Sequence, residues 1–230
     1  MAVKNKSKTP ARSILIVDDH PMMRTGLAQL IGNEPDLKVA AEADTAGQAI
    51  NLVAKQKFDL ALLDISLPDK NGLELIKDLR ALRPELPILV VSMHDEMIYA
   101  ERVLRAGGRG YIMKQEGGQK FLKAIRSVLA GQVFVSETMS SRIMEIFSGR
   151  SPEQTGLPVQ KLSDREFEVL QLVGLGVGTR AISEQLHLSI KTVEVHRANI
   201  KGKLGLKNAP ELLRFAVRWV DAQGPAQKPD

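Results

Sequence analysis

Two adjacent carboxylates follow a short apolar segment near the start of the chain. Residues 14–17 read ILIV, and Asp18 and Asp19 come directly after them. Two anions side by side repel each other, so they need a cation. Carboxylate oxygens favour a hard ion such as Mg²⁺, which is held by few protein ligands. The pair therefore predicts a metal site, provided that the chain turns there, because neighbouring side chains on a strand point to opposite faces.

Three later apolar segments also end in polar residues. Asp64 ends DLALLD, Ser92 ends PILVVS, and Lys114 follows GYIM. A metal beside a carboxylate, a hydroxyl and an ammonium group is suited to phosphoryl transfer, because the metal and Lys114 can neutralise phosphate oxygens and Ser92 can hydrogen-bond another. Asp64 is then the expected nucleophile, forming an acyl phosphate. An acidic pair alone is more often an exposed turn, so the prediction depends on all these residues meeting at one place.

The elements that must bring these residues together alternate along the first half of the chain. Short runs rich in Val, Ile and Leu are interpreted as strands buried on both faces, because they are continuous rather than alternating. Apolar residues between them recur at helical spacing. Strands that are each followed by a helix predict an α/β fold with a doubly wound, parallel sheet, whose functional residues gather at the carboxyl ends of the strands. The predicted strands are residues 14–17, 37–42, 59–64, 87–92 and 110–113.

The pattern changes after residue 131. Residues 136–147 are compatible with a short helix, and the following Gly, Pro, Ser and Gln residues are typical of a linker. From Leu162 onward the pattern is helical, and Ser163 with Glu166 forms a capping box. We therefore expect a second, small all-α domain. The expected boundaries are 12–131 for the first domain, 132–158 for the linker and 159–222 for the second domain.

Two helices of the second domain have helix-turn-helix spacing. They are predicted over residues 179–186 and 190–204, with Ser189 capping the second. The second helix is rich in Lys and Arg, which fits the major groove of DNA, although an ordinary solvated helix face is the alternative. Residues 159–222 carry 10 basic and 7 acidic residues, whereas residues 12–135 carry 16 of each. The basic excess therefore lies partly in the predicted DNA-binding domain.

The composition excludes several classes of protein. The chain has 230 residues, 43% of them hydrophobic, and no cysteine, so disulfides and thiolate metal sites are excluded. No stretch approaches the roughly 18 apolar residues of a membrane span, and the N-terminus lacks the apolar region of a signal peptide. The four histidines show no ligand spacing, so we assign no zinc site. We expect a cytoplasmic protein that is not associated with a membrane.

Residues 12–131 resemble the receiver domain of bacterial response regulators. The resemblance rests on IVDDH, LLDISLPDKNGLELI, VVSMHD and AGGRGYIMK, in this order and at the family's distances. It implies the flavodoxin-like fold with five parallel strands. It also implies that Mg²⁺ is bound by the side chains of Asp18, Asp19 and Asp64 and by the backbone carbonyl of Ser66.

The same resemblance implies the roles of the remaining receiver residues. Asp64 accepts the phosphoryl group, Ser92 hydrogen-bonds it, and Lys114 pairs with it. Tyr111 is the switch aromatic, which is expected to turn inward after phosphorylation; a buried core tyrosine is the alternative. Gly72 is expected to permit unusual dihedral angles beside the site.

Residues 160–222 resemble the LuxR-type DNA-binding domain, on the strength of LSDREFEVL and SIKTVEVHRANIKGKLG. In this family the last helix can form the contact between DNA-bound subunits, although Trp219 is equally well explained as core. His187 stands where the tight turn often has Gly. The resemblance implies that base edges face Glu194, Val195 and Ala198. It places near phosphates Lys191, Thr192, Arg197 and Lys201.

Together the two domains resemble a response regulator of the NarL/FixJ type. The resemblance implies a transcription regulator rather than an enzyme. A sensor histidine kinase would phosphorylate it, and it would bind double-stranded DNA as a homodimer. One alternative is a metal-dependent phosphohydrolase that uses Asp64, against which stands Ser66, where a second acid is expected. Another is a constitutive DNA-binding protein with a vestigial receiver.

Overall fold

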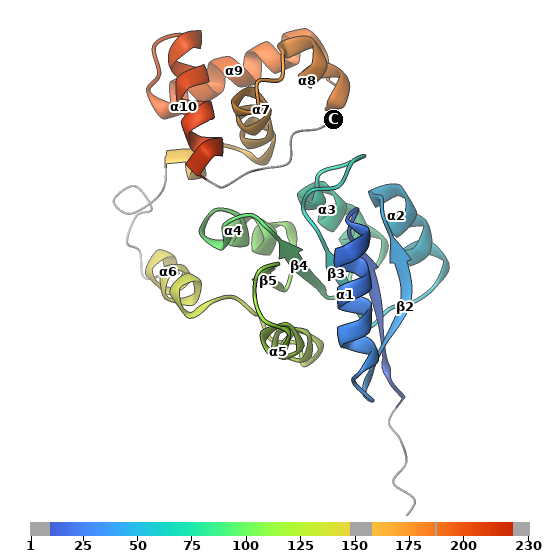
Figure 1. Cartoon of the computed structure of the whole chain (residues 1–230). Coiled ribbons are helices and arrows are strands. Elements are labelled where there is room, and N and C mark those ends of the chain that lie inside the picture. The colour runs from blue at the N-terminus through green and yellow to red at the C-terminus, as the bar shows by residue number, and fades with distance from the viewer. Residues whose placement is uncertain (1–9, 148–157, 187, 223–230) are drawn as a thin grey trace, which may run out of the picture. The chain divides into compact units, whose positions relative to one another are not determined.

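The computed structural model describes residues 10–147, 158–186 and 188–222 (Figure 1). The chain divides into two compact units, residues 1–148 and 149–230. His187 and residues 148–157 of the expected linker lie outside the described residues.

The first unit is built on a parallel five-stranded sheet in the order β2-β1-β3-β4-β5. This confirms the predicted doubly wound topology, with the reversal of strand order between β1 and β3. The inner strands β3 and β4 are buried along their whole length, as expected. β2 differs, because it lies at the sheet edge and its alternate residues are exposed. The strands are β1 Arg12–Val17, β2 Leu37–Ala43, β3 Leu60–Leu63, β4 Ile88–Ser92 and β5 Gly110–Met113.

Helices α1 to α5 lie over the two faces of this sheet (Figure 1). On one face, Leu27 and Ile31 of α1 and Phe121 and Ile125 of α5 pack with the sheet in one apolar cluster. On the other face lie α2, α3 and α4, each of which begins at a side-chain cap that accepts a backbone N–H. The bounds are α1 Pro21–Gly32, α2 Ala46–Lys55, α3 Gly72–Leu82, α4 Glu96–Ala106 and α5 Gly118–Leu129.

After α5 the chain runs along the free edge of β5. The carbonyl of Phe134 accepts a hydrogen bond from the N–H of Tyr111 at 2.8 Å, and the N–H of Phe134 donates to the carbonyl of Arg109 at 3.0 Å. Gly110 permits this approach, because a Cβ at that position would lie 2.8 Å from the Phe134 oxygen. The segment is therefore paired with the sheet as a single β-bridge.

Helix α6, Glu137–Phe147, follows this segment and confirms the helix predicted over residues 136–147. The N–H of Ser136 donates to Oε1 of Glu96 at the start of α4, at 2.7 Å. Met139 is fully buried. Because of these contacts, part of the range expected to be a linker packs with the first unit.

The second unit is helical in all its described elements. Its predicted capping box is present, because Ser163 accepts from the N–H of Glu166 while the Glu166 carboxylate accepts from the N–H of Ser163. A Cβ at Gly174 would collide with the carbonyl of Ala216, so the glycine lets α7 and α10 pack closely. The elements are a 3₁₀ turn Pro158–Lys161, α7 Asp164–Gly174, α8 Thr179–Gln185, α9 Ile190–Leu204 and α10 Ala209–Ala222.

Among the described residues, no helix has the length and apolar character needed to cross a bilayer.

Candidate functional sites

The acidic residues predicted at the strand ends lie together. The N–H of Asp64 donates to the carbonyl of Val17 at 2.8 Å, which places the ends of β1 and β3 side by side. One ligand atom from each of Asp18, Asp19, His20 and Asp64 falls within a cluster no wider than 4.8 Å. The carboxylates of Asp18 and Asp64 are almost fully buried. The structure thus brings the expected acidic set to the carboxyl edge of the sheet.

Lys114 lies between two of these carboxylates. Its Nζ is 2.7 Å from Oδ2 of Asp18 and 2.7 Å from Oδ2 of Asp64. The backbone N–H of Lys114 donates to the carbonyl of Ser92 at 2.8 Å, which anchors the end of β5 to the end of β4. Burial acts to lower the pKa of Lys114, but the nearby carboxylates outweigh it and raise the pKa. Lys114 therefore remains a cation beside Asp64.

Asp64 is the carboxyl group most affected by this environment. Burial raises the pKa of Asp64 from 3.8 to about 6, against the opposing influence of Lys114 and of a hydrogen bond from the backbone of Ser66. The nearby charge of Asp18 adds to the increase. Desolvation dominates because one ammonium group is shared between two buried carboxylates. The site thus holds more negative charge than its lysine neutralises.

His20 belongs to this cluster, although the spacing of the histidines did not predict it. Its N–H donates to Oδ1 of Asp18 at 2.9 Å. Its Nδ1 lies 2.6 Å from Oδ1 of Asp19 and 3.3 Å from Oδ1 of Asp18. The chain therefore turns at the acidic pair, as the sequence required. The position of His20 directly after Asp18 and Asp19 could have predicted its place in the cluster, whereas its spacing to other histidines could not.

Tyr111 occupies the inward position that we expect of the switched state. Its ring is 1% exposed, and its hydroxyl donates to the carbonyl of His94 at 2.7 Å. Burial raises the pKa of Tyr111 well above 10.0, so the hydroxyl stays protonated. Ser92 ends β4, and its Oγ accepts from the N–H of His94 at 3.2 Å. Tyr111 and Ser92 therefore both hold the loop between β4 and α4.

His94 joins that loop to the loop after Asp64, a role that the sequence did not reveal. Its Nε2 lies 2.9 Å from Oγ of Ser66, and its ring stacks on Tyr99 with 4.8 Å between centroids. Burial lowers the pKa of His94, and the charge of Lys114 adds to this. The contact with Ser66 arises only because β3 and β4 are neighbours, so no local pattern could have found it.

The loop that carries Ser66 is fixed at two further points. Asp69 accepts from the N–H groups of Ala46 and Gly47 at 2.8 and 2.9 Å, and so holds the first turn of α2. Gly72 is needed for space rather than for unusual dihedral angles, which corrects the expectation from the sequence. A Cβ at Gly72 would lie 2.7 Å from the carbonyl oxygen of Asp64.

Helix α9 presents the predicted base-reading residues on its outer face. Val193 and Ile200 are fully buried against the rest of the unit. The opposite face is exposed, and Val195 retains 50% of its accessible surface. An exposed apolar side chain on a recognition helix suits contact with a thymine methyl group. Of the predicted DNA contacts, the exposed ones are Lys191, Glu194, Val195 and Ala198.

The other predicted phosphate contacts lie at the margin of this face. Arg197 donates from Nη1 to Oγ1 of Thr179 at 2.6 Å, which ties α9 to the start of α8. The hydroxyl of Thr192 lies 2.8 Å from Oγ of the capping Ser189. Lys201 is half-buried. Arg197 and Thr192 thus support the helix-turn-helix geometry, whatever contact they make with DNA.

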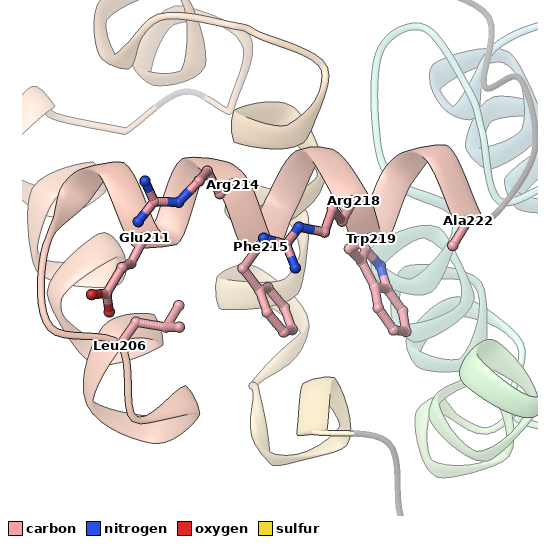
Figure 2. A pocket seen from close by; sticks show the side chains of 7 residues that line it. All are labelled: Leu206, Glu211, Arg214, Phe215, Arg218, Trp219 and Ala222. Atoms are coloured by element: carbon pink, nitrogen blue, oxygen red, sulfur yellow. The ribbon is translucent and has the colours of Figure 1, made fainter.

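Helix α10 carries an open groove of about 440 Å³ on one side (Figure 2). The rings of Phe215 and Trp219 stack there, with an interplanar angle of 4° and 6.5 Å between centroids. Trp219 also packs edge-on against the buried Phe167, so it contributes to the core. Leu213 and Val217 of the same helix are exposed. A contact of α10 with a second subunit therefore stays a prediction.

Comparison with known proteins finds a matching family for each of the two units. Residues 14–126 match the response regulator receiver domain, and residues 160–216 match the bacterial regulatory proteins of the luxR family. The oxygen regulatory protein NreC of Staphylococcus aureus (strain JH9) is 36% identical over 209 residues, which cover 89% of this chain and 96% of that protein.

Solved structures are similar over one or both units. RcsB from Salmonella enterica serovar Typhimurium, bound to promoter rprA in the presence of phosphomimetic BeF3-, has a TM-score of 0.68 at 26% identity, covering 90% of this chain and 98% of that one. A LuxR family response regulator from Aurantimonas sp. SI85-9A1 has a TM-score of 0.56 at 32% identity, covering 60% and 99%. The chain therefore belongs to the two-component response regulators of the NarL/FixJ type, DNA-binding transcription regulators with a receiver domain followed by a LuxR-type helix-turn-helix domain.

Proposed function

We propose that phosphorylation of Asp64 by a sensor histidine kinase controls the binding of this regulator to double-stranded DNA. The observation that carries the proposal is the buried cluster in which Lys114 bridges Asp18 and Asp64. An oxygen of Asp64 forms a bond to phosphorus while the bond from phosphorus to the kinase histidine breaks. The departing imidazole nitrogen keeps the electron pair of that bond.

Receiver domains generally bind Mg²⁺ at an acidic pocket, and the hard oxygen ligands of this cluster fit that ion. Asp18, Asp19 and Asp64, with the backbone carbonyl of Ser66, would hold it. The bound ion would supply positive charge against the oxygens of the transferred phosphoryl group. Lys114, whose Nζ lies 2.7 Å from Oδ2 of Asp64, would pair with one of those oxygens.

Tyr111 and Ser92 would pass the change on to the rest of the molecule. A phosphoryl oxygen that accepts from the Ser92 hydroxyl would draw this side chain toward the phosphate, and so would act on the loop at His94, whose N–H donates to the same Oγ. The Tyr111 hydroxyl donates to the carbonyl of His94 in the same loop, and the backbone N–H of Tyr111 donates to the carbonyl of Phe134. Movement at Tyr111 therefore reaches the segment that leads to α6. Two-state rearrangement of such a segment is a known mode of switching.

The DNA-bound form is proposed to be a homodimer in the cytoplasm. A solved structure of RcsB contains two dimers bound to two parallel DNAs. Two copies of α9 would enter major grooves about one helical turn, or a multiple of it, apart. The proposed domain boundaries remain 12–131, 132–158 and 159–222. The proposed base contacts are Glu194, Val195 and Ala198, and the proposed phosphate contacts are Lys191, Thr192, Arg197 and Lys201.

Labelling of the purified full-length chain with acetyl phosphate tests the phosphoacceptor. Asp64→Asn is expected to abolish Mg²⁺-dependent labelling, because the amide cannot form the acyl phosphate. Asp69→Asn is the matched control, since Asp69 lies on the same loop but caps α2. Labelling that persists in Asp64→Asn, or is lost in both variants, would remove Asp64 from its proposed role.

Two alternatives are separated by further measurements. We propose that the chain is not a phosphohydrolase, because Ser66 stands where a second acid is expected; turnover of phosphate esters would contradict this. A vestigial receiver would show no response to a phosphoryl analogue. A Mg²⁺-dependent change in the fluorescence of Trp219 on adding the analogue would exclude that alternative.

A further inference from the structure

Arg24 makes a contact beside the acidic pair that the proposed phosphoryl transfer does not use. From α1, its Nη1 donates to the backbone carbonyl of Asp18 at 2.6 Å. Its Nε lies 3.5 Å from Oε2 of Glu42 on β2. The Arg24 side chain is 18% exposed, so the guanidinium group is largely inside the protein. It thus connects the end of β1 with a helix and with the neighbouring strand.

The carbonyl of Asp18 lies just beyond the regular strand pairing. The pairing of β1 with β3 ends at Val17, whose carbonyl accepts from Asp64. The chain then turns, with the N–H of His20 bonded to the side chain of Asp18. Arg24 donates to the Asp18 carbonyl at this turn. A carbonyl left there without a donor would lower the stability of the turn.

We propose that Arg24 is a positioning residue for the magnesium site. Successive side chains on a strand point to opposite faces, so Asp18 and Asp19 can both face Asp64 only where the backbone has turned. By holding the Asp18 carbonyl, Arg24 fixes that turn and keeps the two carboxylates converging. This inference rests on the proposed function, because it concerns the same site.

The alternative is that Arg24 acts only through its charge. A cation beside the acidic pair opposes the binding of Mg²⁺, so its removal by itself strengthens Mg²⁺ binding. Loss of the hydrogen bond to the Asp18 carbonyl weakens Mg²⁺ binding, because the carboxylates of Asp18 and Asp19 are then less firmly held in position. Removing Arg24 therefore changes Mg²⁺ affinity in opposite directions under the two explanations.

Titration calorimetry of the full-length chain with MgCl₂ distinguishes them. Arg24→Met, which keeps the length of the side chain but not its donors, is expected to weaken Mg²⁺ binding about tenfold, as loss of an outer-shell partner does. Arg24→Lys keeps a cationic donor and is expected to fall between Arg24→Met and the wild type. Glu42→Gln is the matched control: it removes the ion pair but leaves the bond to Asp18, so its Mg²⁺ affinity is expected to match that of the wild type.

The rate of labelling by acetyl phosphate gives a second readout. In Arg24→Met the Mg²⁺ concentration for half-maximal labelling should rise, while the rate at saturating Mg²⁺ should stay near that of the wild type. A general loss of structure would lower the saturating rate as well. If Arg24→Met does not fold, Arg24→Lys still tests the inference: it keeps the charge, so weaker Mg²⁺ binding than in the wild type would come from the altered hydrogen bond to Asp18.

The outcomes separate this inference from the proposed function. Wild-type protein that binds no Mg²⁺ would overturn both. Wild-type protein that binds Mg²⁺, together with unchanged or tighter binding in Arg24→Met, would overturn the positioning role alone. Weaker binding in Arg24→Met with rescue by Arg24→Lys supports it.

Discussion

Replacement of Asp64 by Asn should make the receiver unit more stable in the absence of Mg²⁺. Asp64 is 3% exposed and shares the ammonium group of Lys114 with Asp18. Above its raised pKa the folded protein therefore holds a buried carboxylate that is incompletely neutralised. Asn has nearly the same shape but no charge, so the variant avoids this electrostatic cost.

The pKa of Asp64 sets the size and the pH range of the effect. The difference between a pKa of about 6 for Asp64 in the folded protein and the ordinary aspartate value of 3.8 corresponds to about 3 kcal/mol, at about 1.4 kcal/mol per pKa unit. Between these values the folded state binds the additional proton, so its stability rises as the pH falls. Asp64→Asn should thus increase the free energy of unfolding by about 3 kcal/mol near about pH 8, and by little near about pH 4.

Urea denaturation of the full-length chain in the presence of a chelator measures this effect. The two tyrosines, Tyr99 and Tyr111, lie in the first unit, and the single tryptophan, Trp219, lies in the second. Tyrosine absorbance therefore follows the receiver, and tryptophan fluorescence follows the DNA-binding unit. Only the tyrosine-detected transition should shift in Asp64→Asn. Added Mg²⁺ should stabilise the wild type more than the variant.

Asp59→Asn is a control with the opposite expected sign. Burial acts to raise the pKa of Asp59, but hydrogen bonds from Ser13 and Arg12 outweigh it and lower the pKa. This variant should therefore lose stability at neutral pH. The reasoning about Asp64 fails if Asp64→Asn is no more stable than the wild type at alkaline pH, or if a gain is undiminished at acid pH.

Three further predictions concern the switch and the DNA-binding unit. Arg197→Ala should weaken binding to all DNA sequences and reduce the salt dependence of binding, measured by fluorescence anisotropy; a change confined to one base pair would mean that Arg197 reads sequence. Tyr111→Ala should leave Asp64 labelled but remove the effect of labelling on DNA affinity; normal coupling would make the ring simply core. Ser163→Ala should lower the stability of the second unit by about 1 kcal/mol, seen in Trp219 fluorescence, and an unchanged midpoint would contradict the capping role.

Local sequence patterns were sufficient to predict most elements and the main cluster. Continuous apolar runs are buried wherever they become inner strands, which is why β3 and β4 agree with the prediction. Parallel strands bring their carboxyl ends to one edge, so Asp18, Asp64 and Lys114 had to meet once the topology was known. Helix caps such as Ser163 and Ser189 depend on neighbours within one turn, so they are also visible in the sequence.

Other features depend on contacts between segments that are distant in the chain. The place of β2 at the sheet edge depends on the order of the strands, although the charged Lys38 and Glu42 already indicate that its alternate residues are exposed. The contact between His94 and Ser66 requires β3 beside β4. The pairing of Phe134 with Tyr111 requires a free edge at β5.

The sequence by itself determined the strands, the helices, the caps and the acidic residues, because each depends on side-chain type and short-range spacing. Only the tertiary structure decided how one lysine is shared between two buried carboxylates, and that Arg24 reaches the carbonyl of Asp18. The physical reason is that electrostatic and hydrogen-bond energies depend on distances between side chains, which are set when the sheet and its helices pack together.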